Sequence, residues 1–354
     1  MIKRNPPFQK IFLLLSLLTL IIVAGIITYI FLFEEASGEY KEYILIVEKG
    51  DTLHSIGKKL ENEGIIKDRR IFIFLSRIVG LEKKIVPSAY KVTSKMNVFQ
   101  IIDILLNEKI YTIKVRIPEG ATSYDIDRIL AEAKLTKPGE IVKAVKNPDL
   151  LRKYNIKSDR LEGFLFPSTY YIPFYYKDKP DKIVELFVNT FFKLVDREEY
   201  SYLASKVGLT FEQAVTLASI IEKEAGRPKD EKYLVSSVFH NRLNRGIHLA
   251  SCATVIYGLM DLNMWKNNNL HKWHLQYDTP YNTYTRRGLP KTPISNPSLE
   301  SLKAAVMPYD TDYLYFVSKN DGTHVFSRTY QEHQKYVNIY QVEYWKKRKQ
   351  NSGN

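Results

Sequence analysis

The longest apolar run of the chain lies near its N-terminus and limits what this part can become. Residues 11–33 read IFLLLSLLTLIIVAGIITYIFLF, 23 positions without a charged side chain. At about 1.5 Å per residue, a helix of this length exceeds the roughly 30 Å apolar thickness of a bilayer. The run therefore predicts a transmembrane helix.

The charges that flank this run predict its orientation. Three basic residues precede it and two acidic residues follow it: Lys3, Arg4, Lys10, Glu34 and Glu35. The positive-inside rule then makes residues 1–10 a short cytoplasmic tail and puts the remaining chain on the outer side. A cleaved signal peptide is the alternative, but its apolar region is typically about 7 to 15 residues long. The longer run here favours a retained anchor.

The composition of the chain is typical of a globular protein with an excess of basic residues. The chain has 354 residues, 45% hydrophobic and 26% charged, which is enough for two or three domains. Its formal charge of +13 indicates an anionic partner, which charge alone leaves open among nucleic acid, an anionic membrane and an acidic envelope polymer. The lone Cys252 excludes an intrachain disulfide and a cysteine-based zinc cluster, and we expect its thiol to be buried.

Residues 40–110 predict a small subdomain of strands and helices. A strand at 43–47 precedes a turn at Gly50 and a helix from about Thr52, and the segment 47–60 resembles the opening of a LysM domain. That family binds N-acetylglucosamine polymers, so the resemblance implies glycan binding, with a purely structural spacer as the alternative. The subdomain continues with further predicted elements, a helix at 70–79, a strand at 88–92 and a helix at 98–106.

A partial internal repeat opens the second region, residues 114–345, for which we expect a mixed α+β fold. The segment 115–130 repeats the strand, glycine turn and helix, because Gly120, Ile126 and Leu130 have the same offsets as Gly50, Ile56 and Leu60. Helices are predicted at 139–145 and 148–154. The turn at 161–170, LEGFLFPSTY, is expected to pack as a loop, with Glu162 as a candidate to face a cleft.

The segment 210–228 predicts a helix that presents carboxylates. Thr210 with Gln213 is a capping-box start, and Gly226 with Pro228 supplies the stop, so the helix is expected over 211–225. Glu224 falls inside the apolar face. Burial and the nearby helix C-terminus both raise a carboxyl pKa, which suits a general acid. Glu222, at the edge of that face, is the rival, and an ordinary surface helix is the plain alternative.

Two later segments offer polar groups for a ligand. A helix predicted at 233–243 ends in Asn241 and Arg242, which are suited to orienting a carboxylate or a glycan. The proline-rich stretch 279–297 is predicted to be a long binding loop. Its candidate sugar-binding residues are Tyr281, Asn282, Thr283 and Tyr284. Strands at 313–317 and 324–326 predict a closing hairpin, before a helix at 330–349 and a disordered basic tail at 346–354.

Six segments in order carry a resemblance to a known family. The segments 217–226, 238–243, 254–259, 281–284, 288–290 and 313–317 resemble the YceG-like family of endolytic murein transglycosylases. This implies a single-pass enzyme of the bacterial inner membrane, with its catalytic domain on the periplasmic side. The implied partners are peptidoglycan glycan strands, the inner membrane and peptidoglycan synthases. The family's catalytic glutamate lies in the Glu-Lys-Glu triplet, and we place it at Glu224, with Glu222 as the alternate.

One position departs from the family. Cys252-Ala253 stands where the family usually carries Asp-Pro before its Thr-Val. If that aspartate assists catalysis, the role is weakened here or has moved, with Asp278 and Glu162 as substitutes. If it only caps a turn, little is lost.

The predicted chemistry needs one carboxyl group and no cofactor or metal. A glycosidase that uses water needs two carboxylates, whereas a lytic transglycosylase can use one glutamate as acid and then as base. The alternative is a non-catalytic, membrane-tethered peptidoglycan-binding scaffold. A zinc hydrolase is disfavoured, because no HExxH motif accompanies the histidines 240, 248, 271 and 274. Nucleic acid is excluded as a partner because an external domain does not meet it.

Overall fold

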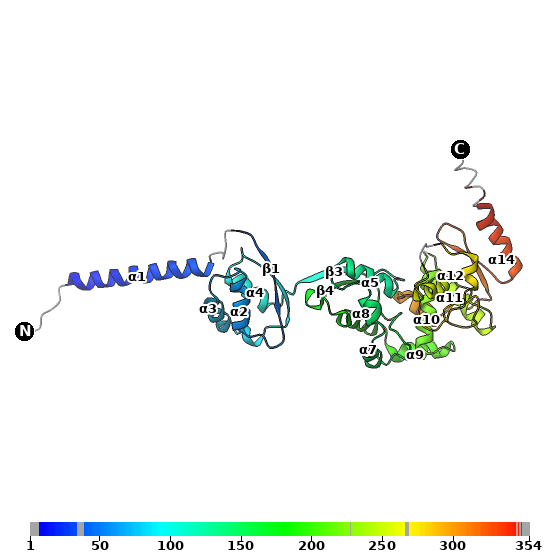
Figure 1. Ribbon diagram of the computed structural model, residues 1–354, viewed down its shortest axis with the longest axis horizontal. Coiled ribbons are helices and arrows are strands. Elements are labelled where there is room, and N and C mark those ends of the chain that lie inside the picture. Colours follow the sequence, from blue (N-terminus) through cyan, green and yellow to red (C-terminus); the bar gives the residue numbers. More distant parts are fainter. Residues whose placement is uncertain are drawn as a thin grey trace, which may run out of the picture. The chain divides into compact units, whose positions relative to one another are not determined.

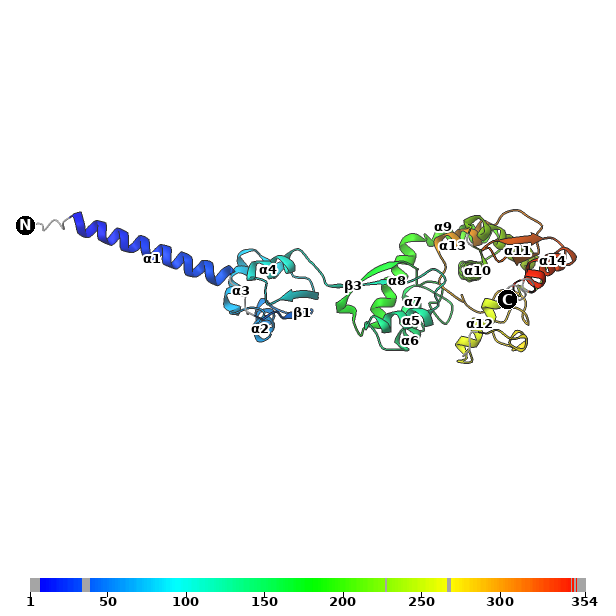
Figure 2. The same ribbon diagram turned by 90° about the horizontal axis from the view of Figure 1, so that it is seen from above.

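The computed structural model describes residues 7–33, 39–226, 228–265, 269–344, 346 and 348. Within the first helix, side chains are described only for residues 11–23 and 25. The chain divides into two compact units, shown in Figures 1 and 2. Unit 1 comprises residues 1–113 with 171–175, and unit 2 comprises 114–170 with 176–354.

The first element is the helix α1, Pro7–Phe33. Its apolar side chains at 11–23 are exposed. A search of the described residues for a helix with the length and hydropathy of a membrane span finds none. The transmembrane helix predicted at 11–33 therefore stays a prediction, and part of its side chains lies outside the described residues.

Unit 1 continues as strand, two helices, strand and helix. These are β1 (Glu42–Val47), α2 (Leu53–Asn62), α3 (Arg69–Ile78), the short turn η1 (Leu81–Lys83), β2 (Ser88–Thr93) and α4 (Val98–Leu106). β1 and β2 pair antiparallel, with Tyr43 opposite Val92. Each predicted start is met within one residue, because the elements begin at local signals such as the capping box of Thr52 and Ser55. The LysM-like assignment stays a prediction.

The repeat of this local structure begins with the last residues of unit 1 and continues into unit 2. β3 (Thr112–Arg116) leads through a turn to α5 (Ser123–Glu132), and β3 pairs with β4 (Thr169–Pro173). Thr122 and Asp125 form a capping box like that of α2. Gly50 and Gly120 both adopt positive φ, +98° and +71°. The repeated apolar positions are all fully buried: Ile56, Leu60, Ile126 and Leu130. The partial repeat is therefore confirmed in local structure.

Most of the remaining regular elements of unit 2 are helices. They are α6 (Glu140–Ala144), α7 (Pro148–Lys153), α8 (Pro180–Leu194), α9 (Arg197–Lys206), α10 (Phe211–Glu224), α11 (Lys229–Asn244), α12 (Cys252–Asp261) and α13 (Leu299–Val306). Short 3₁₀ turns occur at Phe174–Tyr176 and Lys272–Gln276. α10 contacts α9, α11, α12 and α13, and its residues 214–221 are all buried. The helix predicted to carry the catalytic carboxylate is thus central to this unit, and the fold is α+β.

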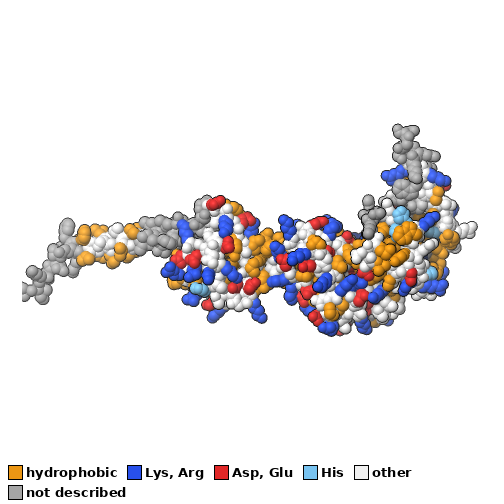
Figure 3. All heavy atoms as spheres, viewed as in Figure 1, with side chains coloured by type: hydrophobic (Ala, Val, Ile, Leu, Met, Phe, Trp, Pro, Cys, Tyr) orange, Lys and Arg blue, Asp and Glu red, His pale blue; other side chains and the backbone are white. Residues whose placement is uncertain are grey.

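An antiparallel hairpin, β5 (Tyr315–Ser318) and β6 (His324–Ser327), follows as predicted. The final helix predicted at 330–349 is confirmed for the described residues: α14 (Tyr330–Val337) continues through a π-helical turn at Asn338–Glu343, and residues 344, 346 and 348 are helical as well. The disordered basic tail predicted at 346–354 lies largely outside the described residues. On the face seen in Figure 3, basic side chains are interspersed with acidic ones over both units.

Candidate active site

The helix α10 has well-defined ends. Thr210 and Gln213 form the predicted capping box, with Gln213 Oε1 accepting a hydrogen bond from the Thr210 N–H at 2.8 Å. Glu224 is the last helical residue, and Ala225 is already extended. A Cβ at Gly226 would lie 2.3 Å from the Gly322 carbonyl oxygen. Only glycine fits there, so the chain leaves the helix closely packed beneath the β5–β6 turn.

The Glu224 carboxyl is enclosed although the residue keeps intermediate exposure. Ser251 Oγ donates to Glu224 Oε1 at 2.5 Å, and the Ala253 N–H donates as well. Burial raises the pKa of Glu224, and this outweighs the lowering by these hydrogen bonds and by the charges of His324 and Arg242. A partly accessible carboxyl with a raised pKa has the properties of a general acid.

Ser251 is itself held by two threonines. Its N–H donates to Thr283 Oγ1 at 3.0 Å, and its carbonyl accepts from Thr254 Oγ1 at 2.7 Å. The two threonine hydroxyls are 2.8 Å apart. Thr283, predicted to bind sugar, is buried, and its hydroxyl accepts the hydrogen bond from the Ser251 N–H. Ser251 was absent from the predicted site, although Ser251 followed by Thr254 before an apolar run is a recognisable helix-start pattern.

Glu222 lies in a different environment from Glu224. Its Oε2 accepts from Ser298 N at 3.0 Å, Ser298 Oγ at 2.6 Å and Ser301 Oγ at 2.6 Å, and it is 3.0 Å from Lys232 Nζ. Burial raises the pKa of Glu222, but these hydrogen bonds and the lysine charge outweigh it, so the net pKa is lowered. Glu222 is therefore an anion that binds the N-terminus of α13.

Asn241 and Arg242 direct their donors at backbone carbonyls. Asn241 Nδ2 donates to the carbonyls of Thr311 and Tyr313 at 2.7 and 2.9 Å. Arg242 donates from Nε to the Leu314 carbonyl at 2.7 Å and from Nη1 to the Leu249 carbonyl at 2.6 Å. They fasten the segment before β5, which explains why that strand begins two residues later than predicted.

The predicted sugar-binding loop contains no helix or strand between 277 and 298, as expected. Tyr281 and Asn282 are buried. The hydroxyl of Tyr281 is 3.1 Å from that of Thr292, and the amide of Asn282 donates to two backbone carbonyls. Tyr284 is only partly buried, and its hydroxyl lies 3.1 Å from Cys252 Sγ. Within this tetrad, Tyr284 is the side chain that faces outward.

Cys252 corrects the expectation of a buried thiol. It is exposed as the first residue of α12. Partial enclosure nonetheless raises the pKa of the Cys252 thiol, opposed by its hydrogen bond with Tyr284, and the nearby Glu224 charge adds to the rise. The position that departs from the family pattern is therefore beside the candidate acid.

Glu162 also lies elsewhere than predicted, because it is completely buried and faces no cleft. It accepts hydrogen bonds from the N–H and hydroxyl of Ser123, from the hydroxyl of Tyr257 and from the amide of Asn296. Burial raises the pKa of Glu162 against these bonds. The carboxylate thus connects its own segment to the three segments that contain these partners, which is a structural role.

Asp278, the other proposed substitute for the family aspartate, is committed to a surface ion pair. Its two carboxylate oxygens accept from Arg286 Nε and Nη2 at 2.7 and 2.9 Å.

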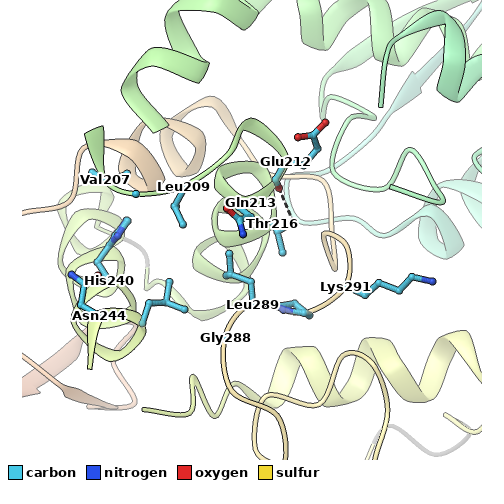
Figure 4. A pocket seen from close by; sticks show the side chains of 13 residues that line it. Val207, Leu209, Glu212, Gln213, Thr216, His240, Asn244, Gly288, Leu289 and Lys291 are labelled. Atoms are coloured by element: carbon cyan, nitrogen blue, oxygen red, sulfur yellow. Dashed lines mark hydrogen bonds between the residues drawn. The ribbon is translucent and has the colours of Figure 1, made fainter. Parts of the chain in front are cut away.

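Two hollows border the 288–291 loop. The one in Figure 4 has a volume of about 470 Å³ and includes Glu212, Gln213 and Thr216, from the first half of α10, among its lining. The other, of about 590 Å³, is lined by the buried tetrad members with two arginines: Tyr281, Asn282, Thr283, Arg286 and Arg287. Among the described residues, no group of three or more potential metal ligands is assembled.

The chain is similar to proteins of known family. The model of the YceG-like family matches residues 45–339. A Bacillus subtilis protein named endolytic murein transglycosylase is 32% identical over 309 residues, which is 82% of each chain. A Streptococcus pneumoniae protein of the same name is 28% identical over 331 residues, 84% of this chain and 58% of that protein.

A solved structure agrees. The crystal structure of a yceG-like protein from Listeria monocytogenes has a TM-score of 0.55 and 29% identity, and the match covers 83% of this chain and 98% of that one. The chain belongs to the YceG-like family.

Proposed function

We propose that this chain is an endolytic lytic transglycosylase of peptidoglycan. The observation that carries the proposal is the Glu224 carboxyl, partly accessible, with a raised pKa, at the end of a buried helix. Its relatives' name, endolytic murein transglycosylase, supports the same activity.

In the proposed reaction Glu224 works first as an acid and then as a base. Its protonated carboxyl donates to the oxygen of the glycosidic bond between N-acetylmuramic acid and N-acetylglucosamine, and that bond breaks. The resulting carboxylate then removes the proton of the muramoyl C6 hydroxyl, whose oxygen closes on C1. The products are a free 4-hydroxyl and a 1,6-anhydro end, and no water is consumed, so a second carboxylate is not required.

The residues around Glu224 would orient its carboxyl, contact the sugar or hold the site in place. Ser251 orients the Glu224 carboxyl, and Arg242 contributes positive charge beside it. Tyr284 and Cys252 form the side of the site that a sugar would meet. Tyr281, Asn282 and Thr283 support this side from within and border the 590 Å³ hollow, where a longer strand would continue. Glu222, Asn241 and Glu162 hold the surrounding segments in place.

The proposal also concerns location and partners. The uncharged run 11–33 would anchor the chain in the bacterial inner membrane, with a cytoplasmic N-terminus and an extracytoplasmic body. Cleavage within nascent strands would end their elongation, which makes peptidoglycan synthases the expected partners. The LysM-like segment in unit 1 would bind the glycan.

The decisive experiment replaces Glu224 with Gln and analyses the products from uncrosslinked peptidoglycan by mass spectrometry. We expect anhydro ends from the unchanged chain and none from the variant. Reducing ends from the unchanged chain would indicate hydrolysis, and anhydro ends from Glu224→Gln would remove Glu224 from the role.

A second candidate is a non-catalytic peptidoglycan-binding scaffold, favoured by Cys252 beside Glu224 where the family carries aspartate. Retention on sacculi without any glycan cleavage would support it. A Cys252→Asp variant that gains cleavage would then locate the defect.

A further inference from the structure

The helix α3 has apolar side chains on two faces. Phe72 and Ser76 are fully buried, and Leu75 packs against the core of unit 1. On the outer side Phe74 is 64% exposed and Ile78 is 66% exposed. Two large side chains this exposed, one turn apart, form a contiguous apolar surface of the sort that marks an interaction site.

Basic residues surround this surface. Arg70 lies four residues before Phe74 and Arg77 three residues after it, so both arginines lie near Phe74 on the helix surface. Lys83 and Lys84 follow in and after η1, and all four basic side chains are exposed. The acidic residues nearby are Asp68, 3.6 Å from Arg70, and Glu82. Four basic groups against two acidic ones leave a net positive rim.

The position of α3 close to α1 indicates which partner this surface would bind. In the sequence only eight residues, 34–41, lie between α1 and β1 of the same unit, and α1 contacts α4, which contacts α3. An amphipathic helix with large apolar side chains between Lys and Arg suits the boundary between lipid headgroups and acyl chains, particularly in anionic bilayers.

We propose that the outer face of α3, defined by Arg70, Phe74, Arg77 and Ile78, binds the surface of an anionic phospholipid bilayer. This inference rests on the proposed membrane anchoring of the chain. Phe74 and Ile78 enter the headgroup boundary, while the arginines and the lysines of η1 meet lipid phosphates. Unit 1 is thereby fixed against the membrane that α1 would enter, so its remaining faces are turned toward the wall.

The test uses residues 39–354, so that α1 contributes nothing to binding. Among the described residues, the buried core begins at Leu45, so this truncation removes no core side chain. Sedimentation with vesicles of phosphatidylcholine alone, and with about one third phosphatidylglycerol, measures the affinity. We expect binding to the anionic vesicles only, weakened by salt, as expected of an electrostatic contact.

Two variants locate the surface. The double substitution Phe74→Ser with Ile78→Ser is expected to weaken vesicle binding about tenfold, because both side chains lose their apolar contact with lipid. The reversal Arg77→Glu with Lys84→Glu should weaken it and remove the salt dependence. The matched control, Leu194→Ser with Tyr202→Ser, removes two exposed apolar side chains of unit 2 and should bind unchanged.

The proposal is overturned if the unchanged chain ignores anionic vesicles, if the α3 variants bind as well as it does, or if the control loses binding equally. Loss of binding to sacculi by the Phe74 and Ile78 variant, without vesicle binding by the unchanged chain, would assign the face to glycan instead. Membrane fractionation of the full chain tests the anchor separately, and glycan cleavage by residues 39–354 tests the enzyme, so the three failures are distinguishable.

Discussion

Ser251 Oγ donates a 2.5 Å hydrogen bond to Oε1 of Glu224, although Ser251 is also the N-cap residue of α12. Its hydroxyl makes no capping bond to its own helix. An N-cap hydroxyl usually accepts a hydrogen bond from a backbone N–H of its own helix. Here the Ser251 hydroxyl instead orients the Glu224 carboxyl of α10.

Replacement of Ser251 by Ala should shift the pH dependence of cleavage. A donated hydrogen bond favours the ionised carboxyl, so its loss raises the pKa of Glu224 further. The acid must be protonated, so the alkaline limb of kcat should move to higher pH, by about one unit for a bond worth about 1.5 kcal/mol. The maximal kcat should fall because the carboxyl loses its orientation. Ser251→Thr, which keeps the hydroxyl, should restore the limb, and an unshifted limb in Ser251→Ala would show that the bond does not act on the titrating group.

The Glu222→Ala variant should be less stable to unfolding but should keep its glycan-cleaving activity. The change leaves Lys232, whose side chain is 12% exposed, without its carboxylate, and breaking a buried pair of this type costs about 3–5 kcal/mol. Urea unfolding measures this cost, and Glu222→Ala with Lys232→Met should recover part of it. Anhydro ends should still be formed at temperatures where the variant is folded, and their complete absence there would make Glu222 the acid.

The same carboxylate predicts a pH dependence of stability. Because the pKa of Glu222 in the folded chain is below its ordinary value of 4.5, its contribution is complete above pH 4.5. It is lost as the pH falls through the folded-state pKa. The stability difference between the unchanged chain and Glu222→Gln should therefore shrink below pH 4.5, and a constant difference at all pH values would contradict the lowered pKa.

The variants Asn282→Ala and Tyr284→Phe should distinguish a residue that stabilises the fold from one that binds the substrate. Asn282 is fully buried and donates to the carbonyls of Leu275 and Tyr277, so its loss should cost about 2–3 kcal/mol of unfolding free energy with little change in KM. Tyr284→Phe removes an outward hydroxyl and should raise KM several-fold while stability changes by less than about 1 kcal/mol. Thermal melting and initial rates measure both, and reversed effects would exchange the two roles.

Alkylation of Cys252 should inactivate the chain. The thiol is exposed beside Glu224 and Tyr284, so an added acetamide group would obstruct a bound sugar. Because the pKa of Cys252 is raised, the rate with iodoacetamide should be slow at pH 7 and increase into the alkaline range. Mass spectrometry gives the labelled fraction for comparison with residual activity. Cys252→Ala should remain active in the presence of the reagent, and inactivation of this variant would point to another target.

Local signals account for what the sequence predicted well. The starts of α2 and α10 follow from a capping box at each N-terminus, so both starts were predicted to within one residue. α9 and α12 were not predicted as helices, since α9 has little apolar periodicity and α12 was noted only as a family motif.

The candidate site was predicted only in part because its geometry is not local. In the sequence Glu224 falls inside the apolar face of the helix and Glu222 lies at its edge, but their opposite pKa shifts depend on groups that are distant in the chain. At Glu222 the hydrogen bonds from Ser298, 76 residues away, help to outweigh burial, whereas at Glu224 burial outweighs the hydrogen bond from Ser251, 27 residues away. In the irregular loop no period distinguishes inward from outward side chains, so Tyr281 and Tyr284 were equivalent in the sequence. Only the packed structure shows that one is core and the other faces out.

The two glycine turns of the internal repeat are under different constraints. A methyl group at Gly50 would meet nothing within 4 Å, whereas at Gly120 it would lie 3.4 Å from Glu222 and 3.5 Å from Lys223. Lys223 Nζ also donates to the Gly120 carbonyl at 3.2 Å. If the two turns descend from one ancestral element, positive φ favours glycine in both copies, but only the second is also packed against α10, so a change there has to be accommodated by that helix as well. Divergence between homologues should therefore accumulate at the turn around Gly50 and be suppressed around Gly120.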